Sequence, residues 1–67
     1  AQNAELLRWA IDKLPERYRA VVEQCDLAEK PIEVVAATLG ITIGGVRTRR
    51  LRAHRMLRTT LKDRGDR

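Results

Sequence analysis

The chain has 67 residues and a net charge of +5, with 34% charged and 43% hydrophobic residues. This length suits one small domain with a limited core, and no apolar run approaches the ~20 residues of a membrane span. A single cysteine, Cys25, and a single histidine, His54, exclude an internal disulfide and a metal-ligand set. We expect Cys25 to be a small core residue in a reducing cytoplasm, with no cofactor.

The spacing of apolar residues predicts two helices before residue 26. The first covers about residues 4–14 and ends at Pro15. This proline begins the second helix, about residues 15–25, as a tolerated first-turn residue, and a polar connection follows over residues 26–30. The apolar stripes are Leu7, Ala10, Ile11 and Leu14 in the first helix, and Tyr18, Val21, Val22 and Cys25 in the second.

Two further helices are predicted on either side of a glycine. Pro31 begins the third, about residues 31–39, and Gly40 ends it because glycine adopts a positive φ easily. Thr42 is a candidate N-cap for the fourth, about residues 43–61, after which residues 62–67 are expected to fray. The inward residues are Ile32, Val35, Ala36 and Leu39 in the third helix, and Val46, Ala53 and Leu57 in the fourth.

The junction of these two helices has the spacing of a helix-turn-helix. Ala36 is a small residue, Gly40 follows four positions later in the turn, and the β-branched Val46 follows six after that. Such a motif places its second helix in the DNA major groove. Here that helix is rich in arginine, which suits guanine edges and phosphates. The sequence therefore predicts an all-α, four-helix domain that binds duplex DNA.

The charges are unevenly distributed along the chain. Residues 1–40 carry five basic and seven acidic residues, a net −2, whereas residues 41–67 carry nine basic and two acidic residues, a net +7. No acidic residue occurs from Ile41 to Lys62, although a merely solvated helix face would mix both signs. The second half of the chain is thus expected to contact nucleic acid.

Two stretches resemble region 4 of bacterial sigma factors, particularly the extracytoplasmic-function (ECF) group. They are LPERYRAVV at residues 14–22 and PIEVVAATLGITIGGVRTRRLRAHRMLR at residues 31–58, and the resemblance covers about residues 6–61. It implies one region 4 domain over residues 1–67, which recognises the promoter −35 element and directs RNA polymerase to initiate transcription. It also implies docking on the β flap of the polymerase core and, in many members, binding by an anti-sigma factor.

Helical geometry places one group of fourth-helix side chains on a broad outward face. Arg47 and Arg52 are the expected base readers; Thr48 is expected at a base or a phosphate, and Leu51 at a thymine methyl or as a spacer. The resemblance supports all four positions as close to bases. The alternative is that these arginines only grip phosphate.

A second group is expected to contact phosphates. Arg49 is better placed for phosphate than for bases, and Arg55 either contacts phosphate or is solvated. Thr42, Gly44 and Gly45 lie at the helix N-terminus, whose free N–H groups favour an anion. The two glycines allow close backbone approach or reflect turn geometry alone.

The chain departs from the family pattern at three notable positions. Pro31 stands where a capping Ser is usual, Gly45 replaces a Thr, and Arg50 replaces an apolar residue. A buried Arg50 would need a partner, for which Glu33 and Glu23 are candidates.

Two other functions remain open from the residues. One is a dimeric helix-turn-helix regulator that binds paired half-sites. The other is a sigma-like protein-interaction module that an anti-sigma factor binds. An enzyme is not expected, because the chain has no catalytic carboxylate pair, Cys/His pair or phosphate-binding loop; neither a small-molecule substrate nor a membrane is expected as a partner.

Overall fold

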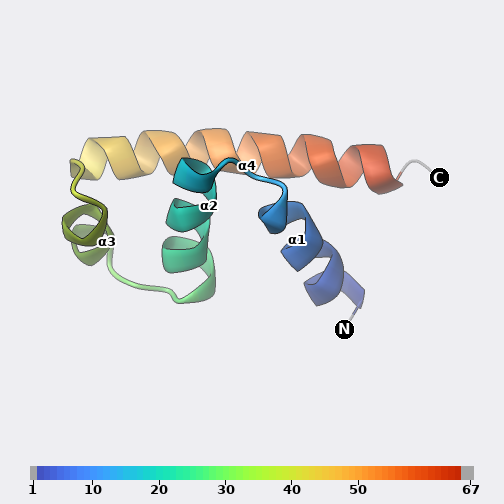
Figure 1. Ribbon diagram of the computed structural model, residues 1–67, viewed down its shortest axis with the longest axis horizontal. Helices are drawn as coiled ribbons and strands as arrows, with labels where there is room; N and C mark the ends of the chain where they lie inside the picture. The colour runs from blue at the N-terminus through green and yellow to red at the C-terminus, as the bar shows by residue number, and fades with distance from the viewer. Residues whose placement is uncertain (1, 66–67) are drawn as a thin grey trace.

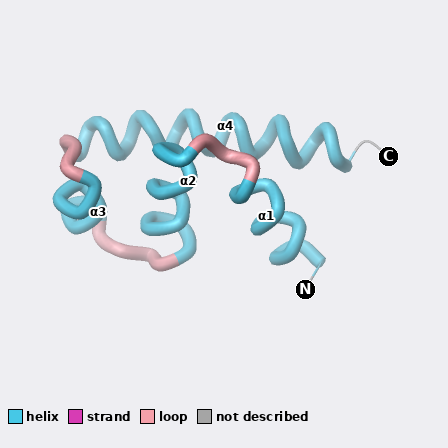
Figure 2. The backbone as a smooth tube through the Cα atoms, viewed as in Figure 1, coloured by secondary structure: helices cyan, strands magenta, loops and turns pink. Residues whose placement is uncertain are grey.

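The computed structural model describes the backbone of residues 2–65 and the side chains of residues 4–64. Its α-helices are α1 (Gln2–Asp12), α2 (Glu16–Val22), α3 (Ile32–Leu39) and α4 (Ile43–Gly65), and a π-helical turn, η1 (Glu23–Leu27), directly continues α2. The described chain is otherwise turn and loop, which confirms the all-α prediction (Figure 2).

Helix α4 sets the length of the molecule. Its 23 residues span about 35 Å at ~1.5 Å per residue, close to the 40 Å long axis. The other three helices lie against one side of it (Figure 1). None of the helices between residues 2 and 65 combines the length and apolar character needed to cross a bilayer.

The core consists of two clusters of buried side chains. The α1 cluster joins α1, the turn after it, α2 and the part of α4 from Ala53 onward; the α3 cluster joins α2, α3 and the start of α4. The α1 cluster contains Ala10, Ile11, Leu14, Tyr18, Val22, Ala53 and Leu57, and the α3 cluster contains Val21, Val35, Ala36 and Val46.

Helix α2 belongs to both clusters through two adjacent residues. Val21 is 0% exposed and packs in the α3 cluster, whereas Val22 is 1% exposed and packs in the α1 cluster. The predicted inward residues are therefore largely buried. Leu7 differs from the prediction, since it is 39% exposed, and Cys25, Ile32 and Leu39 are only partly buried against the α3 cluster.

Both prolines lie one residue before their helices, so the prediction that they occupy the first helical turn is wrong. Pro15 has ψ 152° and Pro31 has ψ 145°, both outside the helical region. The carbonyl of Pro15 accepts the N–H groups of Tyr18 and Arg19 at 3.0 and 2.9 Å. Each proline is thus an N-cap that begins the hydrogen-bonding pattern without supplying a side-chain acceptor.

The first helix ends two residues earlier than predicted. The N–H groups of Lys13 and Leu14 donate to the carbonyls of Ala10 and Ile11 at 3.1 and 3.0 Å, which tightens the chain after Asp12. The residue before a proline is disfavoured in the α region, so Leu14 leaves the helix before Pro15. Leu14 nevertheless remains buried.

The second helical segment ends later than predicted, and in a wider turn. Residues 23–27 are π-helical, and the N–H of Ala28 donates to the carbonyl of Glu23, five residues earlier, at 2.9 Å. Asp26 and Leu27 therefore belong to η1 and not to the connection. The connection itself contains Glu29 with φ 54°.

Helix α4 continues to Gly65, beyond the predicted end at residue 61. The guanidinium of Arg64 lies 4.7 Å from the centre of the Trp9 ring, and the amine of Lys13 lies 5.3 Å from it. This cation–π arrangement holds the last turn of α4 against α1. Fraying over residues 62–65 was thus wrongly predicted, and residues 66 and 67 lie outside the described chain.

Candidate nucleic-acid interface

A Schellman motif makes the turn between α3 and α4. Gly40 has φ 70°, and its N–H donates to the carbonyl of Ala37 at 3.3 Å while the N–H of Ile41 donates to that of Ala36 at 3.0 Å. These two bonds satisfy carbonyls that the helix end leaves free. Ile41 also packs on the α3 cluster, so the turn fixes the direction in which α4 leaves.

Thr42 caps α4, as predicted. Its Oγ1 accepts the N–H of Gly45 at 2.9 Å, and its carbonyl accepts the N–H of Val46 at 3.0 Å. A Cβ added at Gly45 would lie 3.2 Å from this Oγ1. The absence of a side chain at Gly45 therefore relieves crowding around the cap, in keeping with turn geometry. A Cβ at Gly44 would meet only ordinary contact at 3.9 Å.

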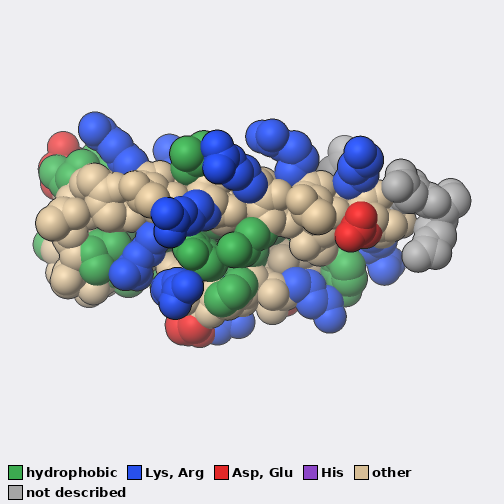
Figure 3. Space-filling view, turned by 90° about the horizontal axis from the view of Figure 1, so that it is seen from above, with side chains coloured by type: hydrophobic (Ala, Val, Ile, Leu, Met, Phe, Trp, Pro, Cys, Tyr) green, Lys and Arg blue, Asp and Glu red, His purple; other side chains and the backbone are tan. Residues whose placement is uncertain are grey.

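The four residues predicted to read bases are all exposed on α4. Leu51 is the most exposed large hydrophobic residue of the described chain, at 54%, whereas Val46, Ala53 and Leu57 on the opposite side are buried. Basic side chains are spread along the face that α4 forms, with hydrophobic side chains between them near its middle (Figure 3). We refer to Arg47, Thr48, Leu51 and Arg52 as the base-reading set.

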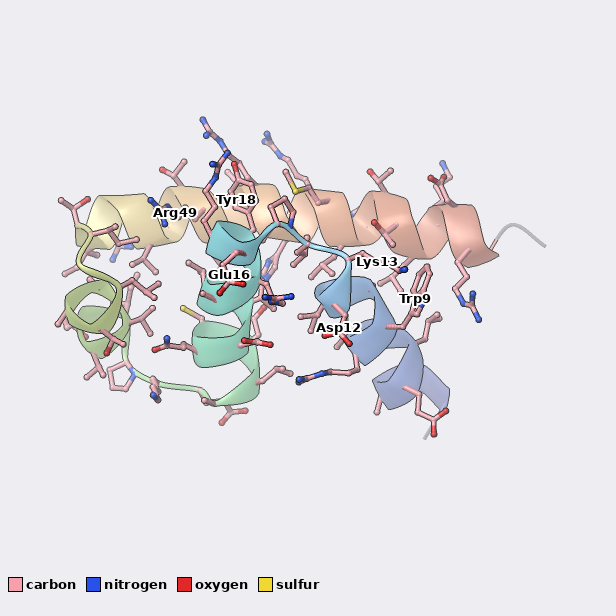
Figure 4. All side chains as sticks on the ribbon, viewed as in Figure 1. Trp9, Asp12, Lys13, Glu16, Tyr18 and Arg49 are labelled. Atoms are coloured by element: carbon pink, nitrogen blue, oxygen red, sulfur yellow. The ribbon has the colours of Figure 1, made fainter. Side chains whose placement is uncertain are left out.

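The residues predicted to contact phosphate divide into two groups. Thr42, Gly44 and Gly45 lie together at the start of α4. Arg49 is partly buried on one flank of α4 (Figure 4). Arg55 is exposed, about one helical turn after Leu51. The helix N-terminus therefore precedes the base-reading set, Arg49 lies beside it, and Arg55 follows it along the same outward face.

Arg52 lies near Tyr18 of α2, a neighbour that the sequence did not reveal. The guanidinium groups of Arg17 and Arg52 beside the hydroxyl hold the pKa of Tyr18 below its ordinary value of 10.0. The ring of Tyr18 is buried, and the guanidinium of Arg17 lies 5.0 Å from its centre. Tyr18 lies where α2 begins beside α4 (Figure 4), so α2 helps to position one member of the base-reading set.

Arg50 is not buried, and its acidic partner is neither Glu33 nor Glu23. Its Nε and Nη2 lie 3.0 and 2.9 Å from Oδ1 of Asp26 in η1. Oδ2 of the same carboxylate lies 2.5 Å from Nε2 of His54. Glu23 instead lies 3.8 Å from Arg8 of α1. We refer to Asp26, Arg50 and His54 as the Asp26 cluster.

The position of Asp26 explains why the sequence did not identify it. Arg50 and His54 are four residues apart on one flank of α4, a spacing that indicates a shared neighbour. Their neighbour is 24 residues away from Arg50 in sequence and lies inside η1. The wider π-turn changes the angular register of Asp26 relative to α2, and a helix predicted to end at residue 25 leaves it in a loop.

Cys25 is a free, partly buried cysteine. Burial raises the pKa of the Cys25 thiol, which keeps it protonated and weakly nucleophilic. Residues 4–64 include no group of three His, Cys, Asp or Glu side chains able to hold a metal ion.

The chain matches a known family over most of its length. The model of the family "Sigma-70, region 4" matches residues 4–57. The chain is 42% identical over 55 residues to the ECF RNA polymerase sigma factor SigE of Mycolicibacterium smegmatis, an alignment that covers 82% of this chain and 21% of that protein. The chain thus spans about a fifth of the length of this relative. No solved structure matches significantly.

A capped, arginine-rich second helix on a Schellman turn is the arrangement expected of a DNA-binding helix-turn-helix, and it lies within the matched residues. The chain therefore belongs to the sigma-70 region 4 family, and over this region it is similar to an ECF sigma factor.

Proposed function

We propose that this domain recognises the −35 element of promoters and so directs RNA polymerase to initiate transcription. The observation that carries the proposal is the outward face of α4, where the base-reading set is exposed on a helix without an acidic residue from Ile43 to Lys62. The family match supports promoter DNA as the ligand. The polymerase core, through its β flap, and an anti-sigma factor are the protein partners that we propose with it.

The base-reading set lies in the first half of α4, which is the part of a helix-turn-helix recognition helix that contacts base edges in the major groove. Arg47 and Arg52 are five residues apart, so their side chains leave α4 about 140° apart, on the two sides of the outward face whose middle Thr48 and Leu51 occupy. Each can donate two hydrogen bonds to O6 and N7 of guanine, and Leu51 between them offers an apolar contact to a thymine methyl. Phosphate contacts from Arg49, Arg55 and the N-terminus of α4 would fix the register.

A selection from randomised duplex DNA tests this proposal. We expect the chain to enrich one short, asymmetric element at low salt, and an Arg47→Ala/Arg52→Ala variant to lose that enrichment. Lys30→Ala/Arg19→Ala removes the same charge from other elements. Lys30 belongs to the loop between η1 and α3, a segment that lies away from α4 (Figure 1), and Arg19 pairs with Glu16 of α2. This control should keep the enrichment.

Single variants separate base reading from phosphate contact. Arg47→Ala should cost about 1–3 kcal/mol on the selected element and relax the preference at one base pair. Arg49→Ala should weaken binding to all sequences alike. A palindromic element would favour the dimeric regulator. Absence of enrichment by a folded chain would contradict −35 recognition and favour the protein-interaction module.

A further inference from the structure

The Asp26 cluster lies at the edge of the proposed DNA-reading surface. Arg50 and His54 line one surface hollow together with Arg47 and Leu51, two members of the base-reading set. Because Arg47 and Arg50 are three residues apart on one helix, their side chains are neighbours, and a free Arg50 guanidinium would lie beside the duplex that Arg47 is proposed to contact. In this structure, however, Arg50 is turned toward η1 by two contacts to one oxygen of Asp26.

The carboxylate is well placed to retain Arg50. The side chain of Asp26 is 25% exposed and that of Arg50 is 48% exposed, so the carboxylate is better shielded from water than the guanidinium. His54 contacts the second oxygen at 2.5 Å, which orients the carboxylate and keeps the first oxygen directed at Arg50. The π-turn that contains Asp26 brings the acid to this flank of α4.

We propose that Asp26 is a positioning residue that determines specificity: its carboxylate holds and neutralises Arg50 beside the base-reading set. A free Arg50 would grip the phosphates of any sequence, because phosphate contacts carry no sequence information. By retaining it, Asp26 lowers binding to random DNA more than binding to the selected element. This inference rests on the proposed function, since it requires that the outward face of α4 binds duplex DNA.

The test compares the salt dependence of binding to random-sequence duplex. Asp26→Asn should release Arg50 and add about one phosphate contact, which steepens the slope of log affinity against log salt by ~0.9. The affinity gain over the unmodified chain should then be about three- to fourfold larger at ~50 mM than at ~200 mM salt. The ratio of affinities for the selected element and random duplex should fall.

Two controls identify the source of this change. Asp26→Asn/Arg50→Gln lacks both the acid and the released cation and should return the slope to that of the unmodified chain. Glu29→Gln removes the same negative charge from an exposed position that forms no ion pair with the described residues, and should not steepen the slope. Circular dichroism establishes that each variant is folded. Asp26→Ser is measured alongside Asp26→Asn, because serine also removes the carboxylate but has a shorter side chain.

The outcomes separate this inference from the proposed function. An unchanged or shallower slope in both Asp26 variants, with selective binding by the unmodified chain, would overturn the role of Asp26 alone. An equal steepening by Glu29→Gln would also overturn it, because net charge would then explain the result. Failure of the unmodified chain to bind duplex DNA would overturn the proposed function and this inference with it.

Discussion

The hydroxyl of Tyr18 connects a core side chain to the proposed DNA-reading surface. Its ring packs in the α1 cluster, while the positive charges of Arg17 and Arg52 beside its oxygen favour the phenolate. Because the folded state then binds the phenolic proton less tightly than the unfolded state does, this contact stabilises the fold increasingly as pH rises from the lowered pKa toward the ordinary one.

Arg52→Gln should raise the pKa of Tyr18 toward its ordinary value of 10.0, because one of the two cations that favour the phenolate is lost. Tyr18 is the only tyrosine of the chain, so ultraviolet absorbance titration follows it directly. Arg55→Gln, on the outward face of α4, is the matched control and should leave the midpoint unchanged. An unaltered midpoint in Arg52→Gln would show that Arg52 does not bond the hydroxyl.

At the scale of elements, the junction of α3 and α4 depends on two glycines for different reasons. Gly40 has φ 70° with open space around its Cα, whereas Gly44 has helical backbone and room for a methyl group. Gly40→Ala should destabilise the fold by about 1–2 kcal/mol, since an L-residue is strained in the left-handed region. Gly44→Ala should stabilise it by about 0.4–1 kcal/mol by restricting the unfolded chain.

Urea unfolding followed by circular dichroism measures both glycine variants against the unmodified chain. Opposite signs are expected. A destabilised Gly44→Ala variant would contradict the ordinary contact that its Cβ makes with Thr42 at 3.9 Å.

The four helices, the glycine turn and the Thr42 cap could be predicted because each depends on residues within one or two turns of the chain. Helix ends were less predictable: Pro15 and Pro31 permit either an N-cap or a first-turn position, and only the packed structure decides between them. The π-turn and the Asp26–Arg50 contact could not be predicted. They depend on a match between η1 and α4 across 24 residues, which no local pattern records.

At the scale of the whole molecule, α2 connects the two core clusters. Val21 and Val22 are adjacent in sequence yet fill different clusters. Val21→Ala and Val22→Ala should each cost about 2 kcal/mol, because each removes two methylene-sized groups from a buried site, and each should lower Tm by roughly 8–16 °C in a domain of this size. Val34→Ala, at a position that is 45% exposed, should change stability by less than about 0.5 kcal/mol.

The two clusters should also unfold together. Trp9 is the only tryptophan and packs against the α1 cluster, so its fluorescence follows that half of the core, whereas circular dichroism follows all helices. The two transitions are expected to coincide in both valine variants, as in two-state unfolding. Separate transitions after Val21→Ala would show that the α3 cluster melts alone.

The straightness of α4 limits how much DNA this domain can read. A rod of about 35 Å is as long as one full turn of the duplex, ~34–36 Å, but the major groove winds around the DNA axis over that distance. A straight rod meets a winding groove as a tangent, so only a few base pairs lie under it before the groove curves away. The basic side chains beyond that point, such as Arg58 and Lys62, would diverge from the bases and face the outside of the duplex. Lengthening α4 would therefore add charge near the sugar–phosphate backbone without bringing any further base pair into contact with the helix.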